Sequence, residues 1–147
     1  MTLEIRPLTP ADRDAWDPLW HGYLVFYEED LPAEVTDTTW RRFFDDDEPM
    51  GIIGAFVDGN LIGFCTHLFH RSTWAVGPYC YLEDLFVTPG SRSFGAGRAL
   101  IEATADLARD AGAEKLYWHT RETNLTARAL YDQVATNVGD IAYERDL

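Results

Sequence analysis

Cysteine is scarce in this sequence, because only Cys65 and Cys80 occur among its 147 residues. Two cysteines provide neither a disulfide framework nor a four-ligand zinc site, so we expect both thiols to be reduced. Long apolar runs are also missing, since a run such as residues 51–57 is far shorter than the roughly 20 residues that cross a bilayer. The first six residues, Met-Thr-Leu-Glu-Ile-Arg, lack the apolar core of a signal peptide. We therefore expect a cytoplasmic protein that does not bind membranes.

Positive charge is in short supply as well, with 12 Lys and Arg against 25 Asp and Glu and a net charge of −13. Such a field repels a phosphate backbone, which argues against a nucleic acid partner. It favours a cationic ligand such as an amine, although an acidic surface also serves solubility alone. The length predicts one domain over residues 1–147, and the hydrophobic content of 46% is that of a globular protein.

The apolar pattern predicts an α/β protein with a mixed sheet. Strands are expected at residues 3–6, 52–57, 61–70, 79–87, 115–120 and 141–143, and helices at residues 9–27, 36–44, 95–111 and 124–135. The order β-α-α-β-β-β-α-β-α-β places an antiparallel meander before a strand-helix-strand unit. If the turn after residue 70 centres near residues 72 and 73, Cys65 and Cys80 lie almost opposite each other, and we interpret them as packed thiols rather than a disulfide.

The most informative stretch is residues 87–98, Val-Thr-Pro-Gly-Ser-Arg-Ser-Phe-Gly-Ala-Gly-Arg, which joins an expected strand to an expected helix. Gly95 and Gly97 allow close approach of a ligand to the helix start, where free N–H groups and the helix dipole attract phosphate. Arg92 and Arg98 add positive charge. The stretch matches neither a P-loop nor Gly-x-Gly-x-x-Gly. A glycine-rich turn without a ligand is the alternative interpretation.

Arg92-x-x-Gly95-x-Gly97 also matches the (Arg/Gln)-x-x-Gly-x-(Gly/Ala) signature of the Gcn5-related N-acetyltransferase (GNAT) family. The preceding strand Tyr81–Val87 and the later segment Leu116–Asn124, with Ala127 and Leu130-Tyr131 after it, resemble the same family. The resemblance covers essentially the whole chain and is closest to small polyamine and Hpa-type acetyltransferases. It implies the GNAT fold and acetyl-CoA as co-substrate, with no metal. It also implies a homodimer, because family members are often dimers.

The resemblance implies a set of cofactor contacts. Backbone groups of Leu85, Phe86 and Val87 would pair with the pantetheine arm and the acetyl carbonyl, while the side chains of Leu85 and Val87 also suit core packing. Backbone N–H groups of Ser93, Phe94, Gly95, Ala96, Gly97 and Arg98 would hold the pyrophosphate. Ser93 stands where the family often has glycine, which leaves the N–H donor in place. Asn124 and Ala127 would contact the pantetheine arm, and Asn124 is equally suited to cap a helix.

Two residues are candidates for proton transfer. By resemblance, Tyr131 donates a proton to the departing thiolate, and its place two helical turns after Asn124 lets both residues face one cleft. By resemblance, Glu83 is the base that deprotonates the amine, directly or through water. Alternation along a strand puts Glu83 on the same face as Leu85 and Asp84, the second choice, on the opposite face. The structural alternatives are an ion pair between Glu83 and an arginine, and a buried aromatic role for Tyr131.

By resemblance, the loop after the first helix borders the acceptor site. Its acids Glu28, Glu29 and Asp30 would form an acidic, aromatic pocket for a cation, together with Tyr27, Trp40 and His119. Solvated loop acids and core aromatics are the alternative. Together with Glu83, the expected substrate-binding residues are therefore Tyr27, Glu28, Glu29 and His119. Cys65 and Cys80 lie in strands without an evident histidine partner, so no covalent nucleophile is nominated.

The expected function is N-acetyl transfer from acetyl-CoA to a primary amine by direct attack in a ternary complex. Backbone N–H groups near Phe86 and Val87 would stabilise the oxyanion. The acceptor is expected to be a small cationic amine or a lysine of a basic peptide. The alternative is a non-catalytic acetyl-CoA sensor, or a module that acts only with a partner.

Overall fold

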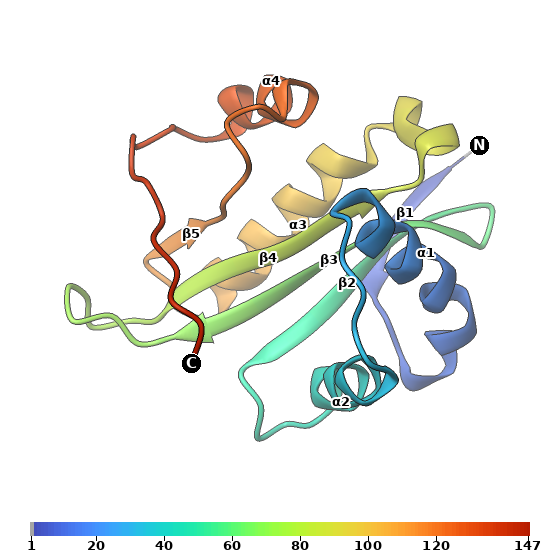
Figure 1. The fold of residues 1–147 in the computed structure, drawn as a ribbon, viewed down its shortest axis with the longest axis horizontal. Helices are drawn as coiled ribbons and strands as arrows, with labels where there is room; N and C mark the ends of the chain where they lie inside the picture. Colours follow the sequence, from blue (N-terminus) through green and yellow to red (C-terminus); the bar gives the residue numbers. More distant parts are fainter. Residues whose placement is uncertain (1) are drawn as a thin grey trace.

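Five strands form one sheet in the order β1-β2-β3-β4-β5 (Figure 1), in a computed structural model that describes residues 2–147 apart from the side chain of Ser93. The strands are β1 Leu3–Pro7, β2 Met50–Val57, β3 Asn60–His70, β4 Tyr79–Val87 and β5 Lys115–Tyr117. The helices are α1 Arg13–Phe26, α2 Ala33–Phe43, α3 Ala96–Asp110 and α4 Leu125–Val134, with 3-10 helices at Pro10–Asp12 and Pro89–Phe94. Strands β1 to β4 are antiparallel and β5 is parallel to β4, which confirms the predicted mixed α/β sheet.

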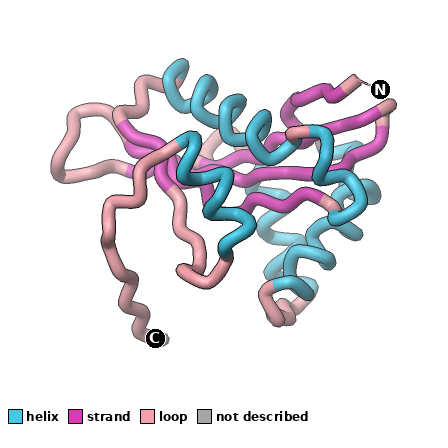
Figure 2. Tube along the Cα trace, turned by 90° about the horizontal axis from the view of Figure 1, so that it is seen from above, coloured by secondary structure: helices cyan, strands magenta, loops and turns pink. Residues whose placement is uncertain are grey.

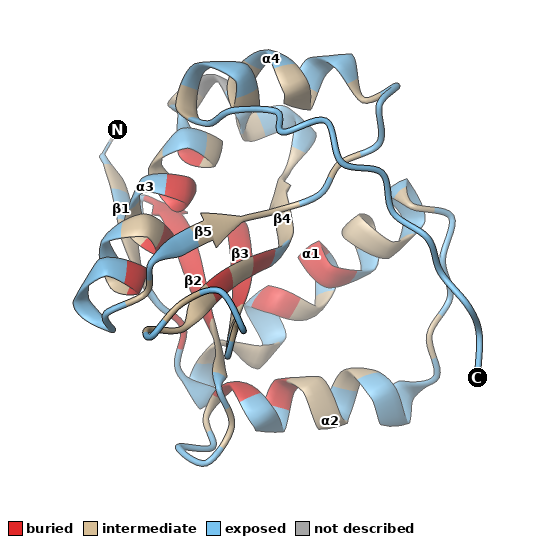
Figure 3. Ribbon diagram, turned by 90° about the vertical axis from the view of Figure 1, so that its left-hand side faces the viewer, coloured by how far each residue is buried: buried red, intermediate tan, exposed pale blue. Residues whose placement is uncertain are grey.

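Helices lie on both sides of the strands (Figure 2), so each face of the sheet carries its own apolar cluster. On one face Trp16 of α1 is fully buried and packs on Trp20 and Trp40, with ring centroids 5.2 and 4.8 Å apart. On the other face Leu100 and Ile101 of α3 pack against the strands. Buried residues concentrate on the central strands and on the helix sides that face them (Figure 3). Burial on both faces makes β2 and β3 almost continuously apolar.

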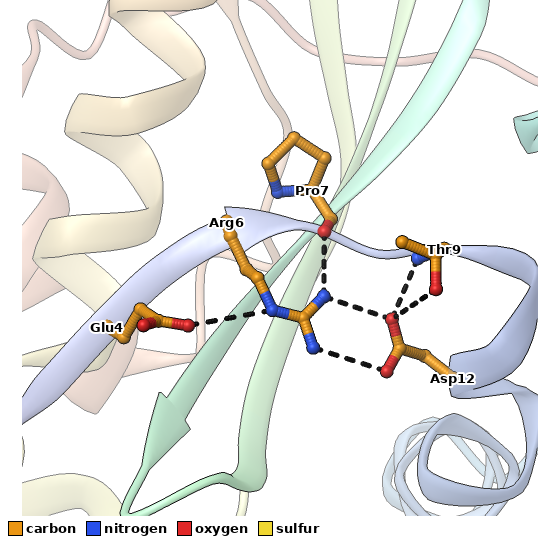
Figure 4. Close-up of polar contacts among 5 residues, drawn as sticks. All are labelled: Glu4, Arg6, Pro7, Thr9 and Asp12. Carbon is orange, nitrogen blue, oxygen red and sulfur yellow. Dashed lines mark hydrogen bonds and ion pairs between the residues drawn. The ribbon is translucent and has the colours of Figure 1, made fainter.

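The entry into α1 is held by a small polar cluster (Figure 4). The Arg6 guanidinium donates to both carboxylate oxygens of Asp12, at 3.0 and 3.3 Å, and Asp12 also accepts the Thr9 backbone N–H at 2.7 Å. The hydrogen bond from Arg6 lowers the pKa of Asp12 from its ordinary value. The helix start predicted at Thr9 is thus confirmed, although its first turn is a 3-10 turn.

A bulge interrupts β4 at Glu83. On β3, Thr66 lies opposite Asp84 and His67 opposite Leu82, so Glu83 has no register partner among the described residues. The extra residue breaks the two-residue alternation, and Leu82 and Leu85, three positions apart, both pack in the cluster beside α3. Alternation therefore does not place Glu83 on the face of Leu85, and that part of the prediction is wrong. Asp84 does lie on the face opposite Leu85, as predicted, because it bonds to Thr66 on the side of the sheet where Tyr23 of α1 packs.

The hairpin between β3 and β4 corrects a second expectation. Cys65 lies opposite Leu85, and Cys80 lies opposite Phe69. The cysteines are not opposed because the turn centres about two residues later than the sequence suggested. Both are buried and free, as predicted.

The chain after α4 also differs from the prediction. Residues 136–147 contain no helix or strand and extend away from α4 as an exposed segment (Figure 1), so the strand predicted at residues 141–143 is wrong. Ile141 and Tyr143 leave 78% and 90% of their surface exposed. A strand forms only with a neighbour to accept its backbone hydrogen bonds, and no such neighbour lies beside this segment within residues 2–147. Within residues 2–147, no helix is long and apolar enough to cross a bilayer.

Candidate functional site

The two parallel strands separate and leave one side of β4 open. Their ladder contains three pairs and ends at Tyr81 opposite Tyr117, whereas β4 continues to Val87. A cavity of about 430 Å³ opens beside this free stretch. Its walls come from α1, β4, the start of α3 and α4, and are formed by Tyr23, Phe26, Tyr27, Leu85, Phe86, Val87, Arg92, Gly95, Gly97, Arg98, Asn124, Thr126, Ala127, Leu130 and Tyr131. An extended ligand with amide groups can pair with the free backbone of β4 as an added strand would.

One end of the cavity suits an anion. Gly95 adopts the left-handed conformation, with φ of +74°, and no side chain caps the first turn of α3. The N–H groups of that turn are therefore free for a ligand, and Arg92 and Arg98 stand beside them. A Cβ atom on Gly97 would meet the Leu130 side chain at 3.3 Å, so α3 and α4 approach closely here.

Two other members of the predicted loop have core positions. Ala96 is buried and Phe94 packs in the cluster beside α3, so their side chains do not line the cavity. Their predicted contribution is through the backbone and is compatible with this placement. The side chain of Ser93 lies outside the described part of the chain.

Helix α4 supplies the opposite wall. The Asn124 side chain accepts the Ala127 N–H at 3.4 Å and so caps the helix, while both residues also line the cavity. Tyr131 lines the same cavity, which confirms that Asn124 and Tyr131 face one cleft. Its ring packs edge-on against Trp118, with centroids 5.5 Å apart. Burial, helped by the nearby Tyr27, raises the pKa of Tyr131 to about 12, so the phenol keeps its proton at neutral pH.

The bulge brings two carboxyl groups close to Tyr23 of the cavity wall. The Thr66 hydroxyl donates to Asp84 at 2.6 Å, and the Tyr23 hydroxyl also bonds to Asp84. Burial raises the pKa of Asp84, although these two hydrogen bonds oppose the rise. Partial burial, together with the charge of Asp84, raises the pKa of Glu83, whose side chain stays accessible to solvent. Two adjacent carboxyls with raised pKa values can accept a proton from a bound cation.

His119 lies near Glu83 and Asp84 through its contact with Tyr81. Its Nδ1 lies 3.2 Å from the Tyr81 hydroxyl, and burial and the charge of Glu83 raise the pKa of Tyr81. The Tyr81 ring stacks on Tyr117, with centroids 5.0 Å apart. His119 is exposed and does not line the cavity.

The predicted acidic, aromatic pocket does not form as a unit. Among its expected members only Tyr27 lines the cavity. Trp40 lies in the core against Trp16, because it occupies the inner side of α2. Glu28 and Glu29 are exposed beyond the end of α1 and do not line the cavity. The expectation that Trp40 contributes to acceptor binding is therefore wrong.

Several wall residues were not identified from the sequence, namely Tyr23, Phe26, Thr126 and Leu130. Tyr23 and Phe26 lie in the last turn of α1, beside the predicted Tyr27, so this end of the helix faces the cavity. Arg121 was also overlooked. Its guanidinium lies over the Tyr27 ring, 5.4 Å from the centroid.

Other chemistries find little support in residues 2–147. These residues contain no group of three or more His, Cys, Asp or Glu side chains that could hold a metal ion. Cys65 lies in the core against Thr104, at 3.1 Å, and burial raises the pKa of its thiol to about 12. A thiol of that kind is a poor nucleophile.

The chain is similar to known proteins in both sequence and fold. The sequence profile of the acetyltransferase (GNAT) family matches residues 16–135. The chain is 35% identical to the D-amino-acid N-acetyltransferase HPA3 of Saccharomyces cerevisiae over 97% of this chain and 89% of that protein. It is 33% identical to a thialysine N-epsilon-acetyltransferase of Caenorhabditis elegans over 89% of this chain and 81% of that one. The structure of AAC(6')-Iy with a bisubstrate analogue shares the fold, with a TM-score of 0.86 at 18% identity over 100% of this chain and 99% of that chain.

Proposed function

Because the chain belongs to the GNAT family of acetyltransferases and is an acetyl-transferring enzyme, we propose that it moves the acetyl group of acetyl-CoA to a primary amine in a ternary complex. The acceptor is a small cationic amine or a basic peptide lysine. The observation that carries the proposal is the single cavity in which an anion-binding helix start, a free strand edge and the phenol of Tyr131 meet.

The donor fits along the cavity. The free N–H groups at the start of α3, with Arg92 and Arg98, suit the pyrophosphate, and nothing lies within 4 Å of where a Gly95 Cβ would stand. The free edge of β4 at Leu85, Phe86 and Val87 suits the amide-bearing arm. Bound in this way, acetyl-CoA supplies an activated thioester.

The acids beside Tyr23 prepare the acceptor. A protonated amine has no free electron pair, and Glu83, directly or through water, takes its proton before attack. The bulge brings Asp84 to the same neighbourhood, so the two carboxyls act as a pair, and the more exposed Glu83 receives the proton. The net charge of −13 attracts a cationic acceptor to this site.

Tyr131 completes the transfer. The amine nitrogen forms a bond to the acetyl carbon as the carbon–sulfur bond breaks, and Tyr131 donates its proton to the departing sulfur. Its raised pKa keeps that proton available at neutral pH. Backbone N–H groups near Phe86 and Val87 stabilise the charge that develops on the carbonyl oxygen.

Mass spectrometry of acetyl transfer tests the proposal. The purified protein and acetyl-CoA are incubated with amino acids, spermidine, an aminoglycoside and a basic histone-tail peptide, and free CoA and acetylated product are both counted. Equal amounts of the two products support the proposal. Binding of acetyl-CoA without any product favours the sensor interpretation, and absence of binding contradicts the assignment of the loop Arg92–Gly97.

The molecule also carries features that suit a homodimer in the cytoplasm. Val138, Ile141 and Tyr143 are exposed in the segment that follows α4, and β5 has a strand partner on one edge within the described sheet. A second copy can cover these side chains and pair with this segment. Free, buried cysteines fit a reducing compartment.

A further inference from the structure

Arg121 contacts an aromatic ring and forms no ion pair among the described residues. Its guanidinium lies over the ring of Tyr27, 5.4 Å from the centroid, and it forms no ion pair or side-chain hydrogen bond with residues 2–147. A guanidinium that stacks on a ring keeps the N–H groups of its edge free. This edge is a preformed fork for a carboxylate.

Tyr27 places this cation beside the reaction site. Its ring lines the cavity that also contains Tyr131, and the two phenols are close enough for Tyr27 to raise the pKa of Tyr131. The charges of Arg121 and Asp84 both act on the Tyr27 hydroxyl, with opposite signs. Among the described residues Arg121 forms no ion pair with Glu83 or Asp84, so its charge is not neutralised by these two acids.

We propose that Arg121 binds the carboxylate of an amino-acid acceptor whose amine is directed toward Glu83 and Asp84. This inference rests on the proposed acetyl transfer and narrows its acceptor. A polyamine offers cationic groups at both ends, and its second cation would be repelled by Arg121. An amino acid carries an ammonium and a carboxylate, which match the acid and the arginine that both lie near Tyr27.

A cation that binds the acceptor carboxylate acts on specificity rather than on bond making. Arg121 favours binding only when the acceptor has a carboxylate, and it gives no favourable contact when that group is absent. The effect of removing Arg121 should therefore appear in the KM for the acceptor, and only for acceptors that carry a carboxylate.

Matched acceptor pairs test this inference. Lysine is compared with 1,5-diaminopentane, and D- and L-alanine with ethylamine, so that each pair differs by the carboxylate. The pairs also distinguish a side-chain amine from an α-amine. Each acceptor is assayed with the natural protein and with the variants Arg121→Gln, Arg121→Lys and Arg109→Gln. Arg109 is an exposed arginine at the far end of α3 and serves as the matched control.

We expect Arg121→Gln to raise the KM for the preferred amino acid by about 10- to 100-fold, the range of a lost charge-assisted pair. Arg121→Lys should recover part of this loss, because it keeps the charge and loses the fork. The KM for acetyl-CoA and for ethylamine should not change, and the KM for 1,5-diaminopentane should decrease if it changes at all, because Arg121 no longer repels its second ammonium group. Arg109→Gln should resemble the natural protein, and circular dichroism confirms that each variant is folded.

Other outcomes separate this inference from the function on which it rests. Equal use of both members of each pair, or an Arg121→Gln variant with an unchanged KM, overturns the role of Arg121 and leaves acetyl transfer intact. Acetylation of a basic peptide alone overturns the amino-acid acceptor and also leaves acetyl transfer intact. If no amine or peptide is acetylated, the proposed function fails, and this inference fails with it.

Discussion

The Thr66 hydroxyl and Asp84 hold each other in a reciprocal arrangement across β3 and β4. The hydroxyl donates to the Asp84 carboxylate at 2.6 Å, and the Asp84 backbone N–H donates to the same hydroxyl oxygen at 3.1 Å. The pair lies directly beside the bulge at Glu83, where the regular ladder is interrupted. The contact with Thr66 holds the Asp84 carboxyl in place, while the neighbouring Glu83 remains accessible. We call Glu83 and Asp84 the acid pair.

The acid pair predicts a particular pH dependence of the reaction. The base must be unprotonated to accept the amine proton, and burial raises the pKa of both Glu83 and Asp84. We therefore expect kcat/KM to fall as pH decreases through a pKa above the ordinary carboxyl values of 4.5 and 3.8. Glu83→Gln should reduce kcat by about 100-fold or more and remove this acidic limb. A limb that persists in Glu83→Gln and disappears in Asp84→Asn would assign the base to Asp84 instead.

The same shift makes a prediction about stability. Because the pKa of Asp84 is raised in the folded protein, the folded state binds this proton more readily than the unfolded state does. The contribution of protonated Asp84 to the free energy of unfolding is therefore fully present below the pKa of the unfolded state. It is lost as pH rises through the higher pKa of the folded state. We expect Asp84→Asn to raise the melting temperature at pH 7 and to leave it nearly unchanged at pH 3. A melting temperature that decreases at pH 7 would show that the hydrogen bonds from Thr66 and Tyr23 outweigh the burial of charge.

Tyr131 is predicted to act on chemistry and not on donor binding. Removing its hydroxyl in Tyr131→Phe should lower kcat by about 100- to 10,000-fold, because the leaving sulfur loses its proton donor. The dissociation constant of acetyl-CoA, measured by calorimetry, should stay within about twofold. Since the pKa of Tyr131 is about 12, no alkaline loss of activity from this group is expected below pH 11. Tyr79→Phe, which alters a tyrosine beside Lys115 and outside the cavity, is the control.

Local patterns predicted most of the fold. The strand Tyr79–Val87 was predicted with its observed bounds, and Thr9-Pro10 correctly marked the start of the first helix. Gly95, directly before α3, correctly indicated an open helix start, because a backbone with φ of +74° favours glycine. These features depend on the sequence of a few neighbouring residues.

Features that depend on distant partners were predicted poorly. Nothing near Glu83 indicates a bulge, because the bulge is a property of the pairing of β4 with β3. A tryptophan such as Trp40 suits a ligand pocket as well as a core. Only the packing of α2 on Trp16 shows that it lies in the core. Arg121 could not be linked to Tyr27 because a long stretch of chain separates them and no motif connects them.

The start of α3 predicts a salt-sensitive contribution to donor binding. Arg98 lines the anion end of the cavity, whereas Arg109 lies at the far end of the same helix, paired with Asp106. We expect Arg98→Gln to raise the dissociation constant of acetyl-CoA by about tenfold in low salt, because a phosphate loses a charged partner. High salt should shrink the difference, since ions screen exposed charges. Arg109→Gln should bind acetyl-CoA normally, and an equal loss in both variants would contradict a local role for Arg98.

The exposed segment after α4 predicts an association between two copies of the chain. Ile141 and Tyr143 are separated by one residue, as on one side of a strand, and both are exposed. Burying such side chains against a second copy releases water and stabilises the dimer. We expect the protein to sediment as a dimer and the double variant Ile141→Asp, Tyr143→Asp to sediment as a monomer with unchanged circular dichroism. The control Ala142→Asp adds a negative charge at the alternate position between them and should remain dimeric. If the natural protein sediments as a monomer at micromolar concentration, these apolar side chains serve another contact and the proposed homodimer is wrong.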